Sequence, residues 1–247
     1  MKIIPVLDLK DGLIVQGIAG RRELYKPIHS VYSDSSRPLD IATALHDAFS
    51  TEGFYLADLD AIGGAAPAED TLKELTAAGF QIDVDAGATE VSELATLLEA
   101  GAHRAIIALE TLTFPLFLRE AVESFGPERI VFSLDLRNGT PVSACEDWQD
   151  APPLDITAAV WGAGIRQMIV LDISSVGTGS GLATRLLCQD IVERFPGLDL
   201  ISGGGIRTEQ EIEELADEQF LSGLLVASLI HQGKLSPALV HRLNAGT

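Results

Sequence analysis

Residues 2–12 read KIIPVLDLKDG, and residues 129–139 read RIVFSLDLRNG. The two stretches align without a gap and lie at corresponding points of the two halves of a 247-residue chain. Each leads through an apolar run to an aspartate, Asp8 or Asp135, and ends at a glycine that favours a turn. A match of this kind indicates that one structural unit occurs twice.

The repeat continues through three further units in the same order. The matched segments are residues 58–63 with 172–177, residues 85–89 with 203–207, and residues 107–109 with 226–228. Because four units recur once in order, the sequence predicts a single domain, 1–247, made of two similar half-barrels at about 1–126 and 127–247.

Apolar segments of strand character alternate with segments of helical period along the whole chain. Strands are expected at 3–9, 54–59, 81–85, 105–109, 130–136, 167–173, 199–202 and 223–227. Helices are expected at 39–49, 71–78, 90–99, 115–124, 156–162, 183–195, 209–217 and 237–243. Eight strand–helix units predict an α/β fold, the (β/α)8 TIM barrel. The alternative is a doubly wound open sheet, which usually contains fewer units.

The charge of the chain limits its partners. The net charge is −19, from 36 acidic and 17 basic residues, and such a surface repels nucleic acid and anionic membranes. No apolar run reaches the ~18 residues that a membrane helix needs, and the first five residues do not resemble a signal peptide. We therefore expect a cytoplasmic protein that acts on a small molecule. The sequence does not predict an oligomeric state.

Metal chemistry is not expected. The chain has two cysteines, Cys145 and Cys188, and neither has a second cysteine or paired histidines at the spacing of a metal site. The five histidines are scattered along the sequence. Both thiols are therefore expected to be free, and no metal is assigned.

The repeat also indicates where catalytic groups lie. Asp8 and Asp135 close the first strand of each half, so both should project at the carboxyl ends of the barrel strands, where barrel enzymes place their catalytic groups. Two carboxyls across one cleft are suited to paired general acid and general base catalysis. A second symmetric pair, Asp58 and Asp172, is expected either to line the site or to serve the structure.

Three loops in the second half are rich in small residues and predict a phosphate site. After the seventh strand the chain reads Gly203-Gly204-Gly205, where backbone N–H groups can approach an anion closely. Ala227-Ser228 opens a short helix after the eighth strand, and Gly177-Thr178 follows the sixth. Because the chain is strongly acidic, a phosphate ester needs a local site of this kind.

These motifs resemble the barrels of histidine biosynthesis, the phosphoribosylformimino-aminoimidazole carboxamide ribotide isomerase and the imidazole glycerol phosphate synthase cyclase subunit. The resemblance spans nearly the whole chain. It implies phosphate sites in the loops and no cofactor. It also implies Asp8 as general base and Asp135 as general acid in an Amadori rearrangement of an aminoaldose. Trp148 lies near the position of a tryptophan that stacks on the isomerase substrate, or else packs on the barrel rim.

Several residues depart from the isomerase pattern. Where the isomerase has a second Gly-Gly-Gly phosphate loop, this chain reads Asp85-Ala86-Gly87, and after the next strand it has Glu110. Carboxylates repel a phosphate, so one of the two phosphate sites is expected to be lost. We therefore expect a substrate with one phosphate, whose uncharged or cationic end faces Asp83, Asp85 and Glu110.

Alternatives remain open at this point. Three other interpretations fit these residues: the histidine-pathway isomerase itself, a cyclase that works with a glutaminase subunit, and a phosphate-ester-binding protein without catalysis. Residues 20–27 and 110–112 also resemble a subgroup linked to tetrahydromethanopterin one-carbon metabolism. The roles of Arg21 and Arg22, in the loop after the first strand, are not assigned by the sequence.

Overall fold

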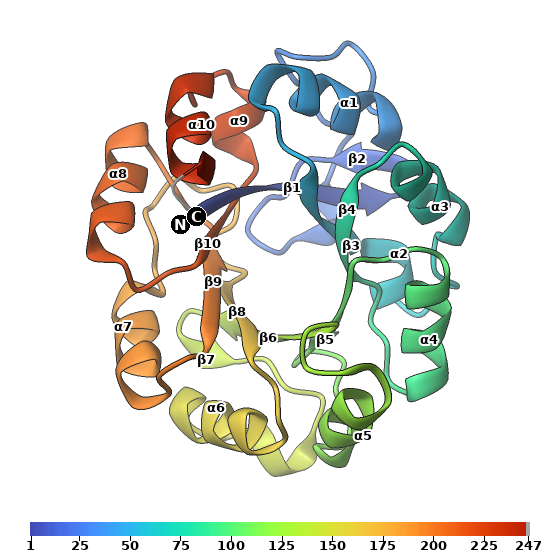
Figure 1. The fold of residues 1–247 in the computed structure, drawn as a ribbon, viewed down its shortest axis with the longest axis vertical. Coiled ribbons are helices and arrows are strands. Elements are labelled where there is room, and N and C mark those ends of the chain that lie inside the picture. The colour runs from blue at the N-terminus through green and yellow to red at the C-terminus, as the bar shows by residue number, and fades with distance from the viewer. Residues whose placement is uncertain (246–247) are drawn as a thin grey trace.

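The computed structural model describes residues 1–245, which form a closed barrel of eight parallel strands inside a ring of helices (Figure 1). The expected strands are all present, with ends that differ from expectation by at most one residue. The barrel strands are β1 (Lys2–Lys10), β3 (Gly53–Asp58), β4 (Gln81–Asp85), β5 (Arg104–Ala108), β6 (Ile130–Arg137), β8 (Gln167–Asp172), β9 (Asp199–Gly203) and β10 (Gly223–Val226).

The pairing of the last strand with the first closes the ring. β10 pairs with β1 in parallel, from Lys2 opposite Gly223 to Pro5 opposite Val226. The remaining strands pair in parallel with their neighbours in chain order, through β3, β4, β5, β6, β8 and β9. The (β/α)8 barrel is therefore confirmed, and the open-sheet alternative is wrong.

Helices follow the barrel strands and cover the outside of the ring (Figure 1). The longer ones are α1 (Pro38–Phe49), α3 (Glu69–Ala77), α4 (Val91–Glu99), α5 (Leu116–Phe125), α6 (Pro153–Gly162), α7 (Arg185–Arg194), α8 (Glu209–Glu218) and α10 (Pro237–Ala245). Two short helices, α2 (Leu59–Ile62) and α9 (Ser228–His231), follow β3 and β10. None of the helices within residues 1–245 is both long and apolar enough to cross a bilayer.

The apolar residues divide into two clusters, as the barrel geometry requires. The larger cluster fills the layer between the strands and the helices and includes Leu7, Phe54 and Phe132. The smaller cluster lies on the opposite faces of the same strands and includes Tyr55, Ile169 and Leu225. Because side chains alternate along a strand, the second set points into the barrel, where it forms the floor of the site.

Two short antiparallel strands extend the ring and were not expected. β2 (Leu13–Val15) pairs with β1, and β7 (Thr140–Pro141) pairs with β6. The connecting turns are Asp11-Gly12 and Asn138-Gly139, and all four residues have positive φ. This is the pattern of a type I′ hairpin, so Asp-Gly and Asn-Gly were available as sequence signals. The matching hairpins occupy equivalent places in the two halves.

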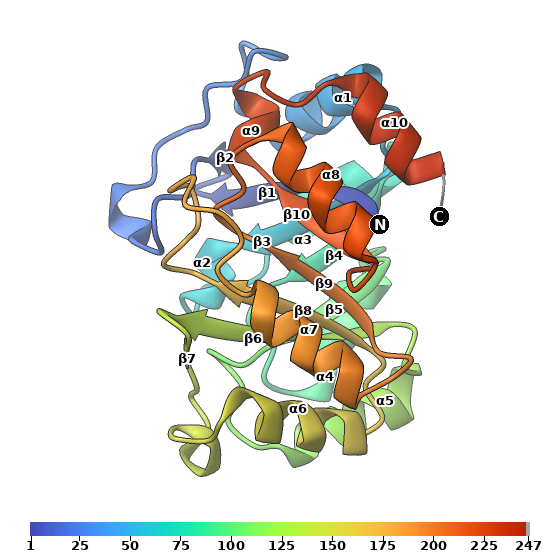
Figure 2. The same ribbon diagram turned by 90° about the vertical axis from the view of Figure 1, so that its left-hand side faces the viewer.

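The loops that follow the strands gather at one end of the barrel. Figure 2 shows β7, β2 and the long segment between β2 and α1 on the same side of the molecule, with both ends of the chain on the other. The segment between β2 and α1 contains a 3-10 helix at Arg22–Leu24. Its backbone meets the loop after β8, where Ala19 N donates to Val176 O at 2.8 Å. This contact covers part of the barrel mouth.

Candidate active site

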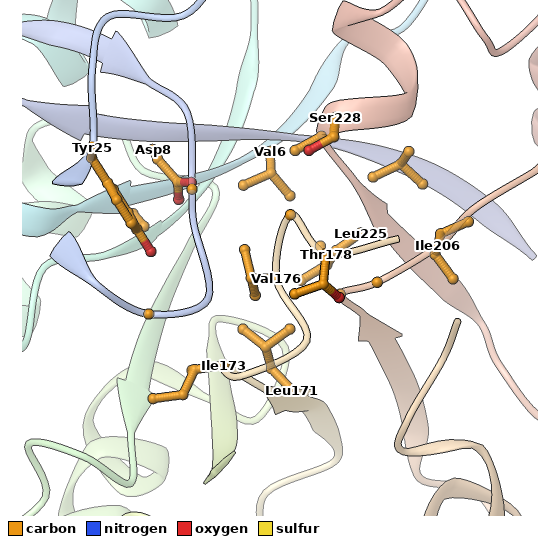
Figure 3. A pocket seen from close by; sticks show the side chains of 18 of the residues that line it. Val6, Asp8, Tyr25, Leu171, Ile173, Val176, Thr178, Ile206, Leu225 and Ser228 are labelled. Carbon is orange, nitrogen blue, oxygen red and sulfur yellow. The ribbon is translucent and has the colours of Figure 1, made fainter. Parts of the chain in front are cut away.

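A cavity of about 730 Å³ opens at the carboxyl ends of the barrel strands. Five acidic residues from both halves line it: Asp8 on β1, Glu23 in the loop after β2, Asp85 at the end of β4, Glu110 after β5 and Asp135 on β6. Figure 3 shows Asp8 and Tyr25 on one side of this cavity and Thr178, Ile206 and Ser228 on the other. Closure of the barrel thus brings the two repeated aspartates into one site.

Asp8 stands within β1, opposite Val15 of the hairpin. It is partly exposed to the cavity but enclosed by the barrel wall, and a Cβ at Gly17 would lie 3.1 Å from its Oδ2. Burial raises the pKa of Asp8 to about 6, against the opposing effect of the Arg22 guanidinium. Near neutral pH this carboxyl is mostly ionised and suited to accept a proton.

Asp135 is more deeply buried, with 6% of its surface exposed. Ser133 Oγ donates to its Oδ1 at 2.8 Å, and no hydrogen bond of normal geometry reaches the buried Oδ2. Burial, followed by the charges of Glu110 and Asp85, raises the pKa of Asp135 well above its ordinary value. The raised pKa favours the protonated form of this carboxyl, which can donate its proton.

Asp85 and Glu110 lie on the side of the cavity formed by β4 and β5. Asp85 is 4% exposed, and its Oδ1 accepts a hydrogen bond from Gly87 N at 3.0 Å. Burial raises the pKa of Asp85 to about 7, and the charge of Glu110 acts in the same direction. Tyr55 also lines this region, and its pKa is raised well above the ordinary value by burial and by the surrounding carboxylates.

Arg22 reaches the same region from the 3-10 helix in the loop after β2. Its Nη2 donates to Glu110 Oε1 at 2.5 Å, forming an ion pair whose side chains are 37% and 19% exposed. The charge of Arg22 also acts on Asp8 and Asp85. Sequence reasoning left Arg22 without a role and did not select Tyr55, because neither residue lies in a repeated motif.

The opposite side of the cavity consists of the small-residue loops. Six of the seven residues expected to bind phosphate line it: Gly177, Thr178, Gly204, Gly205, Ala227 and Ser228. Gly204 has φ of +85°, and a Cβ there would lie 2.7 Å from Ser175 Oγ, so this turn requires glycine. Arg207 and Lys234 lie at the border of the same side. This arrangement offers backbone N–H groups and basic side chains to an anion.

Five further residues selected from the sequence lie outside the cavity lining. Gly203 packs against β10, where a Cβ would lie 2.6 Å from Leu225 Cβ. Trp148 is buried and packs edge-to-face on Phe132, with the ring centroids 6.5 Å apart. Asp83 forms an ion pair with Arg104 and a hydrogen bond with His103. Asp83 therefore lies away from the cavity, where it was expected to face the substrate, and of the two alternatives for Trp148 its contacts favour packing against the barrel.

Asp58 and Asp172, the second symmetric pair, hold loops in place. Asp58 accepts hydrogen bonds from Ala61 N and Ala68 N, at the start of α2 and in the loop after it. Asp172 accepts hydrogen bonds from Asn138 N and Gly139 N in the hairpin turn. Both carboxyls are 3% exposed, so of the two alternatives the contacts favour a structural role.

The described residues offer no grouping of three or more His, Cys, Asp or Glu side chains that fits a metal ion. The acidic residues of the cavity instead contact Arg22, Ser133 and backbone N–H groups. In this arrangement the carboxyls are set up for proton transfer and for electrostatic contacts with a ligand.

Comparison with known proteins identifies the relatives of this chain. The family described as Histidine biosynthesis protein matches residues 2–236. An uncharacterized protein of Methanocaldococcus jannaschii is 33% identical over 235 residues, covering 95% of each chain. Proteins of Syntrophomonas wolfei and Deinococcus radiodurans are 30% and 31% identical, again over 95% of each chain. Both are named as imidazole-4-carboxamide isomerases, and that name carries two 5-phosphoribosyl groups.

The family match covers all eight barrel strands, including those that carry the residues of the cavity. It runs from the second residue of the chain past Lys234 at the cavity border. Named isomerases at this level of identity show an isomerase-like enzyme rather than a barrel of unrelated activity. The chain belongs to the histidine biosynthesis protein family and is an isomerase-like enzyme within it.

Proposed function

We propose that this protein catalyses an Amadori rearrangement, the conversion of an aminoaldose to an aminoketose, on a substrate that carries one phosphate. One observation carries the proposal: Asp8 and Asp135 line the same cavity, and their surroundings give them different acidities. Two carboxyls whose pKa values are separated in this way provide a base and an acid at the same pH.

The reaction follows from these two states. Asp135 donates its proton to the ring oxygen as the bond from that oxygen to C1 breaks, leaving an iminium at C1. Asp8 then removes the proton from C2, which gives an enolamine. The enol proton returns to Asp135 while Asp8 delivers its proton to C1, so the aminoketose forms and both carboxyls regain their starting states. Each positioned proton transfer contributes on the order of 10²–10⁴ in rate.

The two sides of the cavity support a substrate with one phosphate. The loops after β8, β9 and β10 present glycines, Thr178 and Ser228, which suit a phosphate group. The side formed by β4 and β5 carries Asp85 and Glu110 and would repel a second phosphate. The substrate of the named relatives carries two phosphoribosyl groups, so we infer that this enzyme acts on a different compound.

Substitution of the two aspartates tests the assignment. We expect Asp8→Asn and Asp135→Asn each to lower kcat by roughly 10²–10⁴, with a much smaller change in substrate binding, because each removes one proton transfer. Turnover is measured as ketose formation from aminoaldose monophosphates, with Asp190→Asn on the exposed face of α7 as the control. Full activity in either cavity variant would refute the acid–base assignment.

A second candidate is the histidine-pathway isomerase reaction itself. Identity of 30% and 31% to proteins with that name favours it. In that case Arg22, which stands beside Asp85 and Glu110, would have to leave Glu110 and hold the second phosphate. Rescue of a histidine auxotroph that lacks the isomerase would support this candidate. Failure of rescue, together with turnover of a monophosphate, would support our first proposal.

A further inference from the structure

The cavity is electrically asymmetric. Arg207 and Lys234 border the side formed by the loops after β9 and β10, whereas Asp85 and Glu110 lie at the ends of β4 and β5. In the closed ring, β4 and β9 are separated by four strand positions, and so are β5 and β10. The basic and acidic ends of the cavity therefore face each other across the barrel mouth.

The middle of the cavity is largely apolar. Val6 and Leu225 come from the adjacent strands β1 and β10, and Leu171 comes from β8. Figure 3 shows Val6, Leu171 and Leu225 between Asp8 and the loop that carries Ile206. A ligand that spans the cavity thus meets basic groups, an apolar stretch and acidic groups in turn.

The acidic end holds three carboxyl groups, those of Asp85, Glu110 and Asp135, and two cations of the lining, Arg22 and Arg137 at the end of β6. Arg22 is the only cation among the principal influences on Asp85, and it is already paired with Glu110. Asp135 adds a second observation, because it is 6% exposed, lines the same cavity, and no hydrogen bond of normal geometry reaches its buried Oδ2. Buried polar atoms are nearly always paired in a folded protein, so this oxygen indicates a ligand that supplies the missing partner.

We propose that the acidic end is a subsite for a protonated amine, so that the ligand is a phosphate ester with an ammonium group at its far end. The inference rests on the phosphate side assigned in the proposed function and names the group opposite it. Glu110, and Asp85 in the ionised form that a nearby ammonium favours, would accept hydrogen bonds from the ammonium, and such charge-assisted bonds are among the stronger ones in proteins. A carboxylate or second phosphate at this position would instead meet like charges.

Occupation of the subsite would also activate the general acid. The charges of Glu110 and Asp85 help to raise the pKa of Asp135. An ammonium placed between them offsets those charges, and the pKa of Asp135 falls toward its ordinary value. Asp135 then donates its proton more readily, so recognition of the cationic end and ring opening are coupled through the same groups.

The test measures binding, so it does not depend on turnover. Titration calorimetry compares ω-aminoalkyl phosphates of increasing chain length with ω-hydroxyalkyl phosphates of the same lengths, and inorganic phosphate serves as the probe of the phosphate side alone. At the best length, we expect the amine to bind roughly tenfold or more tightly than the alcohol, as a hydrogen bond to a charged group provides. Equal affinity of the two series would overturn the subsite.

Two variants change the charge of the subsite in opposite directions. Glu110→Gln removes a carboxylate and frees Arg22, so the amine preference should fall about tenfold and ω-carboxyalkyl phosphates should bind more tightly than before. Arg22→Met leaves Glu110 unpaired, so the amine preference should grow. The matched controls, Glu120→Gln on exposed α5 and Arg21→Met next to Arg22, make the same changes in net charge and should leave the preference unaltered.

The outcomes separate this inference from the proposed function. If phosphate binds and the aspartate variants lose turnover, but amines and alcohols bind alike, the amine subsite is refuted and the isomerase proposal stands. If neither phosphate nor any of the esters binds, both are refuted. A preference that fell equally in Glu120→Gln would show a long-range charge effect and would also refute the subsite.

Discussion

Asp8 and Asp135 occupy equivalent places in the two halves of the sequence, yet their carboxyl groups meet different neighbours. Arg22 opposes the effect of burial at Asp8, whereas Glu110 and Asp85 reinforce it at Asp135. The repeat supplies two identical side chains, and in the reaction that we propose their surroundings suit Asp8 to act as the base and Asp135 as the acid. At the residue scale, the chemistry therefore depends on the charges placed around the repeat.

The pH dependence of turnover tests this account of Asp8. Because burial raises the pKa of Asp8 to about 6, kcat/KM should rise as the pH passes through about 6 and the base ionises. Arg22→Met removes the charge that favours the ionised form, so this acidic limb should move to higher pH by up to about one unit. The pH–rate profiles of the wild type, Arg22→Met and Arg21→Met are compared. An unmoved limb in Arg22→Met contradicts the account.

The stability of Asp85→Asn provides a test that needs no substrate. The folded state holds the Asp85 proton up to a pH of about 7, whereas an unfolded aspartate loses it near its ordinary value of 3.8. Stability should therefore fall as the pH rises between these values, at a cost of roughly 4 kcal/mol above the folded pKa. We expect Asp85→Asn to unfold at higher denaturant concentration than the wild type at about pH 8.

The same comparison at low pH and a variant on the protein surface are the two controls for the Asp85→Asn experiment. At about pH 3 the Asp85 carboxyl is mostly protonated in both the folded and the unfolded state, so Asp85→Asn and the wild type should have nearly the same free energy of unfolding. Asp190→Asn, on the exposed surface of α7, should show little difference from the wild type at either pH. A variant that is less stable than the wild type at about pH 8 would mean that Asp85 contributes more through its hydrogen bonds than it costs through burial.

At the scale of elements, the site depends on two loops that meet above the strands. Gly177, in the loop after β8, has φ of +72°, and a Cβ there would lie 2.2 Å from Gly17 O in the loop after β2. Ala19 N donates to Val176 O beside this contact. Two backbones approach this closely only where one of them lacks a side chain, so glycine permits the loops to cover the cavity.

Substitution of Gly177 by alanine tests whether the two loops close on each other. We expect Gly177→Ala to push them apart and to speed hydrogen exchange at Ala19 N, while amides in the barrel strands are unchanged. Gly179→Ala is a matched control, because Gly179 also has positive φ but its nearest contact for a Cβ is Arg207 Cγ at 3.8 Å. Similar exchange at Ala19 in both variants would attribute the effect to backbone conformation alone.

At the scale of the whole molecule, net charge opposes compactness. The chain carries a net charge of −19, and several of its ion pairs are exposed and stabilise it little. We expect Tm to rise by a few degrees as sodium chloride increases from about 0.01 M to about 1 M, because the Debye length falls from about 30 Å to about 3 Å. Calorimetry measures Tm, and an equal concentration of uncharged osmolyte is the control. A falling Tm contradicts the prediction.

The amino-acid sequence by itself determined the barrel, the positions of its eight strands and the strands that carry Asp8 and Asp135. Apolar periodicity is a local property that each segment expresses wherever it folds, and the repeat fixed how many segments there are. The glycine-rich loops could also be predicted from the sequence, because the conformations that these loops adopt need residues without a Cβ. Even the unexpected hairpins had their signal in Asp11-Gly12 and Asn138-Gly139.

Only the tertiary structure decided which polar side chains share the cavity. Asp58 and Trp148 lie on the expected elements but contact neighbouring loops and the outer core, whereas Arg22 enters from a segment without periodicity and pairs with Glu110. The direction in which each of these side chains points depends on how the barrel closes and on how the long loop crosses the barrel mouth. Neither arrangement is encoded by a local sequence pattern. Acidity depends on the same arrangement, because a pKa responds to burial and to charges from distant parts of the chain.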